Sequence, residues 1–262
     1  RRTPLARQAD LHLAVRPAVG EVLAEAPLRL RLMAAVLKRF FAAVAVAIVL
    51  LSCALIAAVA IAIAGYLTLG EHERTKAALR WLYRWPLFIP FVVAGQIMRT
   101  FLAKNGMLNH VLVGSGLIEP LAAQSLLDWR GIVIAFVWKQ APFVTLLLAG
   151  AMASVETQHI EAARNLGAPR WRVLFGIVLP QVRGTRLVGL VLSFVTMLSV
   201  LSVPLMINPN SPTMMTVDVA YRISTHGDYA VANALCLISL LFGGAGAWVY
   251  LHHAVKKAEG TA

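Results

Sequence analysis

The chain has 262 residues, of which 59% are hydrophobic and 14% are charged, and its mean hydropathy is +0.74. An ordinary soluble domain carries roughly 25% charged residues, so this composition excludes a soluble globular protein and indicates an all-α polytopic membrane protein. The net charge of +12 would suggest nucleic acid in a soluble protein. Here the cationic residues fall mainly outside the apolar segments, where membrane orientation and lipid headgroups explain them, so no nucleic-acid partner is expected.

The N-terminal segment, residues 1–42, is basic and mixed in character. Between Leu28 and Phe40, apolar residues recur every four positions with Arg and Lys among them. This pattern predicts an amphipathic helix that lies in the membrane interface. The chain begins at Arg1 rather than Met, so either the start was trimmed or residues are missing.

Five apolar segments follow and predict five membrane spans. Residues 43–69 form one unbroken apolar run, which is long enough for a single tilted span. A second span, at roughly 85–103, contains Pro86, Pro90 and Gly95, and these residues predict a kinked or partly unwound helix. The remaining spans are expected at about 131–153, 187–207 and 234–253, with a re-entrant or surface helix near 121–127 and a tail at 256–262.

The stretch between the third and fourth spans, residues 155–180, is polar, basic and interrupted. It contains the pattern E-A-A-x3-G-x9-I-x-L-P, beginning at Glu161. Two alanines follow this free carboxylate and leave room for close approach of another protein. Gly167 suits a helix end that needs a left-handed residue, and Pro169 suits the first turn of a second helix. We therefore expect helix, break and helix, with Trp171 in an apolar stripe on the second arm.

This pattern resembles the EAA loop of permease subunits in type I, binding-protein-dependent ABC importers. The resemblance implies a transmembrane permease domain over residues 43–255, in the inner membrane of a bacterial cell, with the loop docking on an ATPase subunit. It also implies two ABC ATPase subunits, a second permease chain of the same or a related kind, and a periplasmic or lipid-anchored solute-binding protein. The apolar first span usual ahead of this core is replaced by the basic segment 1–42. The positions implied to act in ATPase coupling are Glu161, Ala162, Ala163, Asn165, Gly167, Arg170 and Trp171.

The distribution of Lys and Arg predicts the orientation of the spans. With the EAA-like loop inside, the inner segments 70–84, 154–186 and 256–262 hold eleven of these residues, whereas the outer loops hold three. This bias agrees with a cytoplasmic loop. Residues 1–42 hold eight basic residues on the opposite side, so either this segment lies in the outer interface or the span count is off by one.

Few polar groups interrupt the spans, and none of them is a carboxylate. An unpaired cation within a bilayer is costly, so Arg99 and Lys139 are expected to face a water-filled path or a partner, or else to extend to the interface. On the fourth span, Ser193 and Thr196 share one helical face, which borders a cavity or serves helix packing. The candidate translocation-path residues are Gln96, Arg99, Lys139, Gln140, Ser193 and Thr196.

Several catalytic patterns are missing from the sequence. There is no phosphate-binding G-x4-G-K-[ST] loop, no metal-binding cluster and no nucleophile–base arrangement, so we expect no enzyme activity, cofactor or metal in this chain. The leading hypothesis is a permease driven by a separate ATPase through alternating access. The alternative is a secondary transporter, or another polytopic membrane protein, that is not coupled to ATP. The substrate is expected to be a small solute of the polyamine, ferric ion, thiamine, organophosphonate or sugar type, and cations without a carboxylate near the path favour an anionic or neutral solute over a polyamine.

Overall fold

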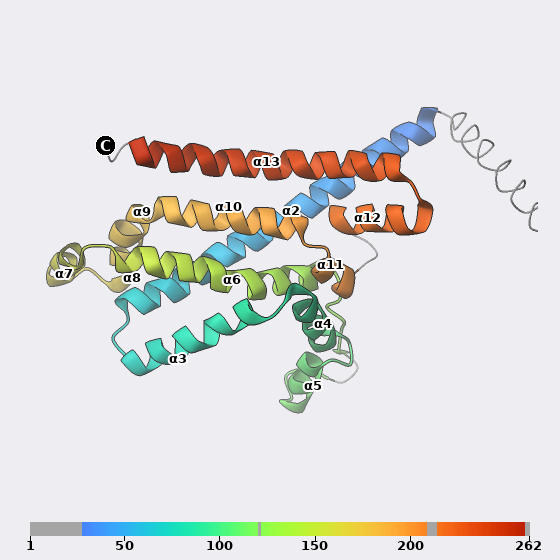
Figure 1. Ribbon diagram of the computed structural model, residues 1–262. Helices are drawn as coiled ribbons and strands as arrows, with labels where there is room; N and C mark the ends of the chain where they lie inside the picture. The colour runs from blue at the N-terminus through green and yellow to red at the C-terminus, as the bar shows by residue number, and fades with distance from the viewer. Residues whose placement is uncertain (1–27, 120–121, 209–213, 260–262) are drawn as a thin grey trace, which may run out of the picture. The chain divides into compact units, whose positions relative to one another are not determined.

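The computed structural model describes residues 28–119, 122–208 and 214–259, and every regular element over these residues is a helix (Figure 1). The chain divides into two units, Arg1–Ala43 and Val44–Ala262. The elements are α2 Leu28–Leu69, α3 Glu73–Arg84, η1 Trp85–Phe88, α4 Phe91–Leu102, α5 Met107–Gly114, α6 Trp129–Ala153, α7 Thr157–Asn165, α8 Arg170–Val173, η3 Leu174–Val178, α9 Leu179–Gln181, α10 Arg183–Ser199, α11 Ser202–Ile207, α12 Met215–Tyr221, η4 Arg222–His226 and α13 Tyr229–Glu259.

Three helices are long and apolar enough to cross a membrane unbroken. They are Ala43–Leu69 within α2, the whole of α6, and Tyr229–Trp248 within α13. Their positions confirm the first, third and fifth predicted spans. Helix α2 begins at Leu28, so the predicted amphipathic helix over residues 28–40 is helical and continues into the first span without a break.

The other two predicted spans correspond to bent pairs of helices. Glu73–Phe88 and Phe91–Gly114 meet at 109°, and Arg170–Gln181 and Arg183–Ser199 meet at 76°. The first bend confirms the predicted kink, because Pro86 lies in the 3₁₀ turn η1 and Pro90 is the N-cap of α4. Counting each bent pair as one span gives up to five spans in the described residues.

Two predicted elements differ from the structure. The described part of 121–127 contains no α-helix, whereas Met107–Gly114, predicted as part of a loop, is helical. The side chain of Asn109 holds this helix in place, because its Nδ2 donates to the carbonyls of Ala103 and Lys104 before the helix and of Gln124 after it. The fourth span was predicted at 187–207, but α10 ends at Ser199 and α11 is a separate helix.

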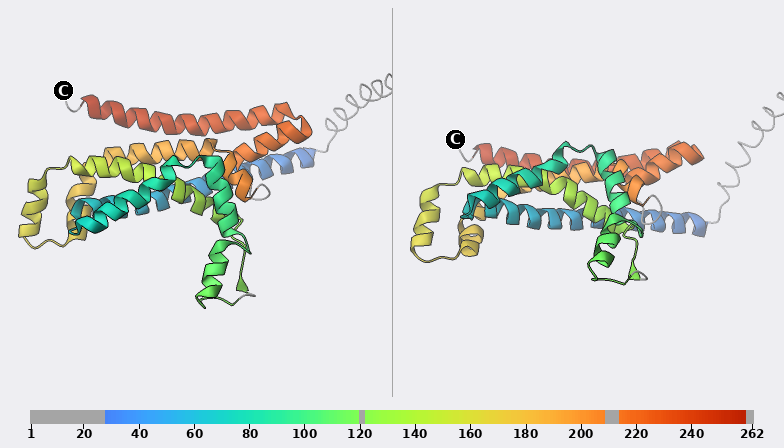
Figure 2. Two further views of the ribbon diagram at one scale, coloured as in Figure 1. Left: turned by 60° about the horizontal axis from the view of Figure 1, so that its bottom comes forward. Right: turned by 90° about the horizontal axis from the view of Figure 1, so that it is seen from below.

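Helix α6 lies at the centre of the packing in the second unit. Its side chains Ile132, Phe136, Val144 and Leu148 are fully buried, and α4, α10 and α11 pack against it. Helix α10 lies between α6 and α13, as the views in Figures 1 and 2 show. A Cβ placed on Gly189 would lie 3.4 Å from Val144, which is ordinary van der Waals contact, so this face of α10 packs directly on α6.

Candidate functional site

The EAA-like loop folds as two helical arms joined by a tight turn. Helix α7 is capped at its C-terminus by two backbone hydrogen bonds, from Gly167 N–H to the Arg164 carbonyl at 2.9 Å and from Ala168 N–H to the Ala163 carbonyl at 3.1 Å. This pair of bonds is the Schellman motif, which needs a left-handed residue just past the helix end. Gly167 supplies it with φ +77°, which confirms the conformation predicted for this glycine. A residue with a Cβ would adopt that φ at a cost of about 1–2 kcal/mol.

The second arm starts directly after the turn. Pro169 is the N-cap of α8 rather than a residue of its first turn, and the helix continues through the π-helical turn η3 into α9 before it breaks at Val182. Large apolar side chains on the loop face outward, with Leu166 89% exposed and Trp171 61% exposed. Arg170 and Arg172 lie beside them, so this tip combines apolar area with positive charge.

The predicted coupling residues gather on one projecting element. Glu161, Ala162 and Asn165 of α7 are exposed and Ala163 is half-buried. Figures 1 and 2 show α7 beyond the end of α6, apart from the packed helices. The loop therefore presents a carboxylate and a small-residue surface where a second protein has free access. The coupling role of these residues stays a prediction.

Two arginines of the loop hold it to the end of α2, and the sequence analysis missed this arrangement. Arg164 donates from its guanidinium to the carbonyl of Leu69 at 3.0 Å. Arg170 forms a hydrogen-bonded ion pair with Glu71, in the link between α2 and α3. The hydrogen bond from Arg170, followed by its positive charge, lowers the pKa of the Glu71 carboxyl from its ordinary value. Both contacts join positions more than 90 residues apart, so no local pattern in a single sequence indicates them.

A cavity of about 580 Å³ lies at the base of the loop. Glu161 and Arg164 of α7 line it together with Arg80 and Arg84 of α3 and the C-terminal part of α6. The Glu161 carboxylate thus shares the cavity lining with three guanidinium groups. This arrangement offers polar groups of both signs to an incoming side chain.

The six candidate path residues do not come together in one place. Gln96 and Arg99 are exposed on α4, Lys139 and Gln140 are buried in α6, and Ser193 and Thr196 lie on α10, buried and half-buried. Thr196 donates to the carbonyl of Leu192, which is the local hydrogen bonding expected of a packing residue. None of the six lines the cavity at the base of the loop. Their assignment to a translocation path stays a prediction.

Lys139 is held inside the helix packing rather than reaching the surface. Its side chain is 7% exposed, and its Nζ donates to the carbonyl of Pro86 at 2.5 Å and to that of Leu87 at 3.3 Å. The ring of Phe91 lies 5.1 Å from the ammonium group, within cation–π range. Lys139 therefore satisfies carbonyl groups at the break between η1 and α4.

These features together define a class of protein. An all-helical bundle with up to five candidate spans carries, between its third and fourth spans, a projecting pair of helices with the E-A-A and Gly pattern. Within the described ranges no three His, Cys, Asp or Glu side chains gather as metal ligands would. This is the architecture of the membrane component of an ABC importer.

Comparison with known proteins assigns the family. The family model for the binding-protein-dependent transport system inner membrane component matches residues 57–257. The chain belongs to this family of ABC importer permeases, whose members are inner-membrane proteins.

Similar proteins come from several transport systems. The molybdenum transport system permease protein ModB of Escherichia coli strain K12 is 31% identical over 168 residues, which cover 63% of this chain and 71% of that protein. The sulfate transport system permease protein CysW of the same strain is 34% identical over 41% of this chain and 36% of its own length. The trehalose/maltose transport system permease protein MalF of Thermococcus litoralis is 25% identical over 71% of this chain and 64% of its own length.

Solved structures show the same fold. A chain of the bacterial alginate ABC transporter, in complex with alginate pentasaccharide-bound periplasmic protein, superposes with a TM-score of 0.63 at 18% identity over 95% of this chain and 94% of that one. A chain of the MetNI methionine ABC transporter in an inward-facing conformation gives a TM-score of 0.56 at 16% identity over 80% of this chain and 92% of that one. At these identities the likeness concerns the fold alone.

Proposed function

We propose that this chain is the permease subunit that couples ATP hydrolysis on two separate ATPase subunits to uptake of a small solute by alternating access. The observation that carries this proposal is the α7 arm, capped at Gly167 and projecting beyond α6 with Glu161 and Ala162 exposed. An ATPase pair that closes on ATP would move the α7 arms of two permease chains, and the helices packed behind each arm would follow. A solute-binding protein would deliver the solute on the opposite side.

The Arg164 and Arg170 contacts explain how a small arm can transmit this movement. An arm that is joined to the membrane helices only by its two chain ends can pivot without moving them. Here two side-chain contacts fix it to the end of α2 as well. Force applied at the Glu161 surface therefore reaches the first span and not only α6.

The solute proposed for this permease is a small anion. Two relatives are named for molybdenum and sulfate transport, and no carboxylate of this chain falls within its apolar spans. Arg99 is exposed on α4 and forms no ion pair within the described residues. The sequence alone left the polyamine, ferric ion, thiamine, organophosphonate and sugar classes open. These points favour sulfate or molybdate over all of these except the organophosphonates, which are anions as well.

Two loop variants test the coupling step. Gly167→Pro is incompatible with φ +77°, because the proline ring holds φ near −65° and removes the capping N–H. Glu161→Lys reverses the charge offered to the ATPase. In membranes that contain the full transporter, we expect both variants to insert normally, to retain less ATPase on affinity purification, and to take up sulfate or molybdate at least an order of magnitude more slowly.

Matched controls lie in the outer loop. Gly116 also has a positive φ, of 74°, and Gly116→Pro makes the same backbone change far from α7. Glu119→Lys makes the same charge reversal there. Full ATPase retention in Gly167→Pro or Glu161→Lys would contradict the coupling role. Wild-type retention without uptake of either oxyanion would contradict only the solute assignment.

A further inference from the structure

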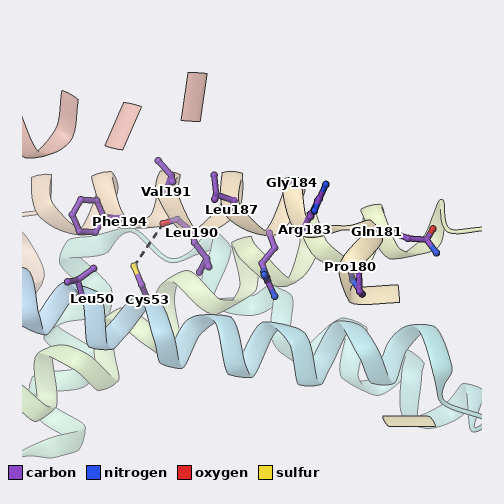
Figure 3. A pocket seen from close by; sticks show the side chains of 11 residues that line it. Leu50, Cys53, Pro180, Gln181, Arg183, Gly184, Leu187, Leu190, Val191 and Phe194 are labelled. Atoms are coloured by element: carbon purple, nitrogen blue, oxygen red, sulfur yellow. Dashed lines mark hydrogen bonds between the residues drawn. The ribbon is translucent and has the colours of Figure 1, made fainter. Parts of the chain in front are cut away.

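A wide groove separates α2 from α9 and α10, and its lining changes character along its length. Its volume is about 1230 Å³. Figure 3 shows Leu50 and Cys53 of α2 facing Leu190 and Phe194 of α10 across it. The Cys53 thiol, at 4.0 Å from the Leu190 carbonyl, is the contact drawn between the two walls.

One end of this groove is cationic. Arg183 and Arg186, on the first turn of α10, line it together with the amide of Gln181. Neither guanidinium has an ion pair or hydrogen bond to any residue in the described part of the chain, and no carboxylate lines the groove. Each of these guanidinium groups has the planar fork of N–H donors that binds a phosphate group in a bidentate way.

The rest of the groove is apolar, and its length matches one leaflet of a membrane. Leu187, Leu190, Val191 and Phe194 continue the wall from Arg186 along α10. At 1.5 Å per residue, Arg183 and Phe194 are separated by roughly 16 Å along the helix. The hydrocarbon core of a bilayer is about 30 Å thick, so one leaflet contributes about 15 Å.

We propose that this groove binds one anionic phospholipid, with its phosphate on Arg183 and Arg186 and an acyl chain along the apolar wall. A free oxyanion would meet the two guanidinium groups but would leave the apolar wall without a partner. A zwitterionic lipid would fill the wall but offers less net charge to the cationic end. The lipid belongs to the cytoplasmic leaflet, because α10 begins next to the EAA-like loop. This one step rests on the proposed function, which places that loop in the cytoplasm. The cytoplasmic leaflet of membranes is rich in anionic lipids.

Lipid binding is measured directly on the detergent-solubilised permease, without ATPase or transport. Native mass spectrometry counts bound molecules during titration with phosphatidylglycerol or with phosphatidylcholine of the same chains. We expect saturable binding of phosphatidylglycerol. The variant R183Q/R186Q should bind it roughly 25-fold more weakly, about fivefold for each charge lost near an anionic headgroup.

Two further variants distinguish binding of the lipid headgroup from binding of the acyl chain. Arg74→Gln with Lys76→Gln removes the same charge from α3, on the same side of the membrane but outside the groove, and should leave binding unchanged. Leu50→Trp alters no charge; because Leu50 is 55% exposed, the change leaves the core intact and only narrows the apolar part of the groove. We expect it to weaken phosphatidylglycerol binding as well.

Four outcomes would overturn the proposal. Equal binding of phosphatidylcholine, or an equal loss in the α3 control, would mean that the groove does not select an anionic lipid. Displacement of the lipid by sulfate or molybdate would assign the arginines to a free oxyanion. If R183Q/R186Q binds as many lipid molecules as the wild type but no longer associates as a dimer of two permease chains, the groove belongs to the interface with a second copy of this chain. All of these readouts are independent of ATPase binding, so a failure of the proposed function is recognised separately.

Discussion

At the scale of single residues, the ion pair between Arg170 and Glu71 fastens the EAA-like loop to the segment that connects α2 and α3. Charge reversal tests this contact. Glu71→Arg or Arg170→Glu alone places like charges together, so the arm should separate from α2. We expect a full transporter that carries either single variant to hydrolyse ATP but to transport several-fold less solute per ATP, and the double exchange to recover most of the loss. Glu73→Arg is the control, because Glu73 forms its ion pair with Lys76 inside α3 and not with the loop. No recovery in the double variant would contradict a specific role for the pair.

The same pair predicts how acid affects the loop. A carboxyl whose pKa is lowered in the folded protein contributes stability at pH values above its unfolded pKa, and this contribution is lost as the pH falls through the folded pKa. Arg170 lowers the pKa of Glu71, so the contact should persist from neutral to mildly acidic pH. It should fail only below the ordinary range of a glutamate.

Local rules predict some of these residues and not others. The role of Gly167 in the helix cap follows from its place after a helical segment and before Pro169, because capping depends only on adjacent residues. The partners of Arg164 and Arg170 depend on which distant segment lies beside the loop, and composition and periodicity contain no such information. For the same reason, the sequence indicated that an unpaired charge on Lys139 within the membrane is costly, but it did not indicate that the carbonyls of Pro86 and Leu87 accept its hydrogen bonds.

At the scale of elements, α6 holds the bend between η1 and α4 through Lys139. Replacement of this residue by Met keeps the length of the side chain but removes the ammonium donor from the Leu87 carbonyl and leaves the Pro86 carbonyl with the Ile89 N–H alone. An unsatisfied buried acceptor costs about 1–3 kcal/mol, so we expect Lys139→Met to lower the midpoint of thermal unfolding of the solubilised permease. Lys104→Met, at an exposed position, should leave the midpoint unchanged. An unchanged midpoint would contradict a stabilising role for the ammonium group, and a higher one would show that the group destabilises the bundle.

Long apolar elements were predictable and short polar ones were not. The spans at 43–69 and 131–153 agree with α2 and α6 because their length and hydropathy leave no other structure in a membrane. Helix α5 depends on three hydrogen bonds from Asn109 to loop carbonyls, which only the folded chain brings together. The end of α10 at Ser199 lies within an apolar run, where hydropathy contains no signal for a break.

At the scale of the whole molecule, charge and fold predict which loops face the cytoplasm. Leu166 in the coupling loop is 89% exposed and Leu117 in the opposite loop is 72% exposed, so a cysteine at either position should react freely. With Cys53 and Cys236 replaced by Ser and the permease expressed without its ATPase, a membrane-impermeant maleimide should label Leu117→Cys in intact cells. It should label Leu166→Cys only after the cells are opened. Labelling of Leu166→Cys in intact cells would invert the proposed orientation.

The attachment of the coupling loop to α2 has a consequence for engineering. A chimaera that transplants only residues 155–180 into another transporter leaves Arg170 facing whatever that host has in place of Glu71. If the short stretch from Leu69 to Glu71 is exchanged along with the loop, both arginines of the loop keep their partners on α2 and on the segment that follows it. A chimaera that contains both segments should therefore couple solute uptake to ATP hydrolysis by the host's ATPase more efficiently than a chimaera that contains either segment alone.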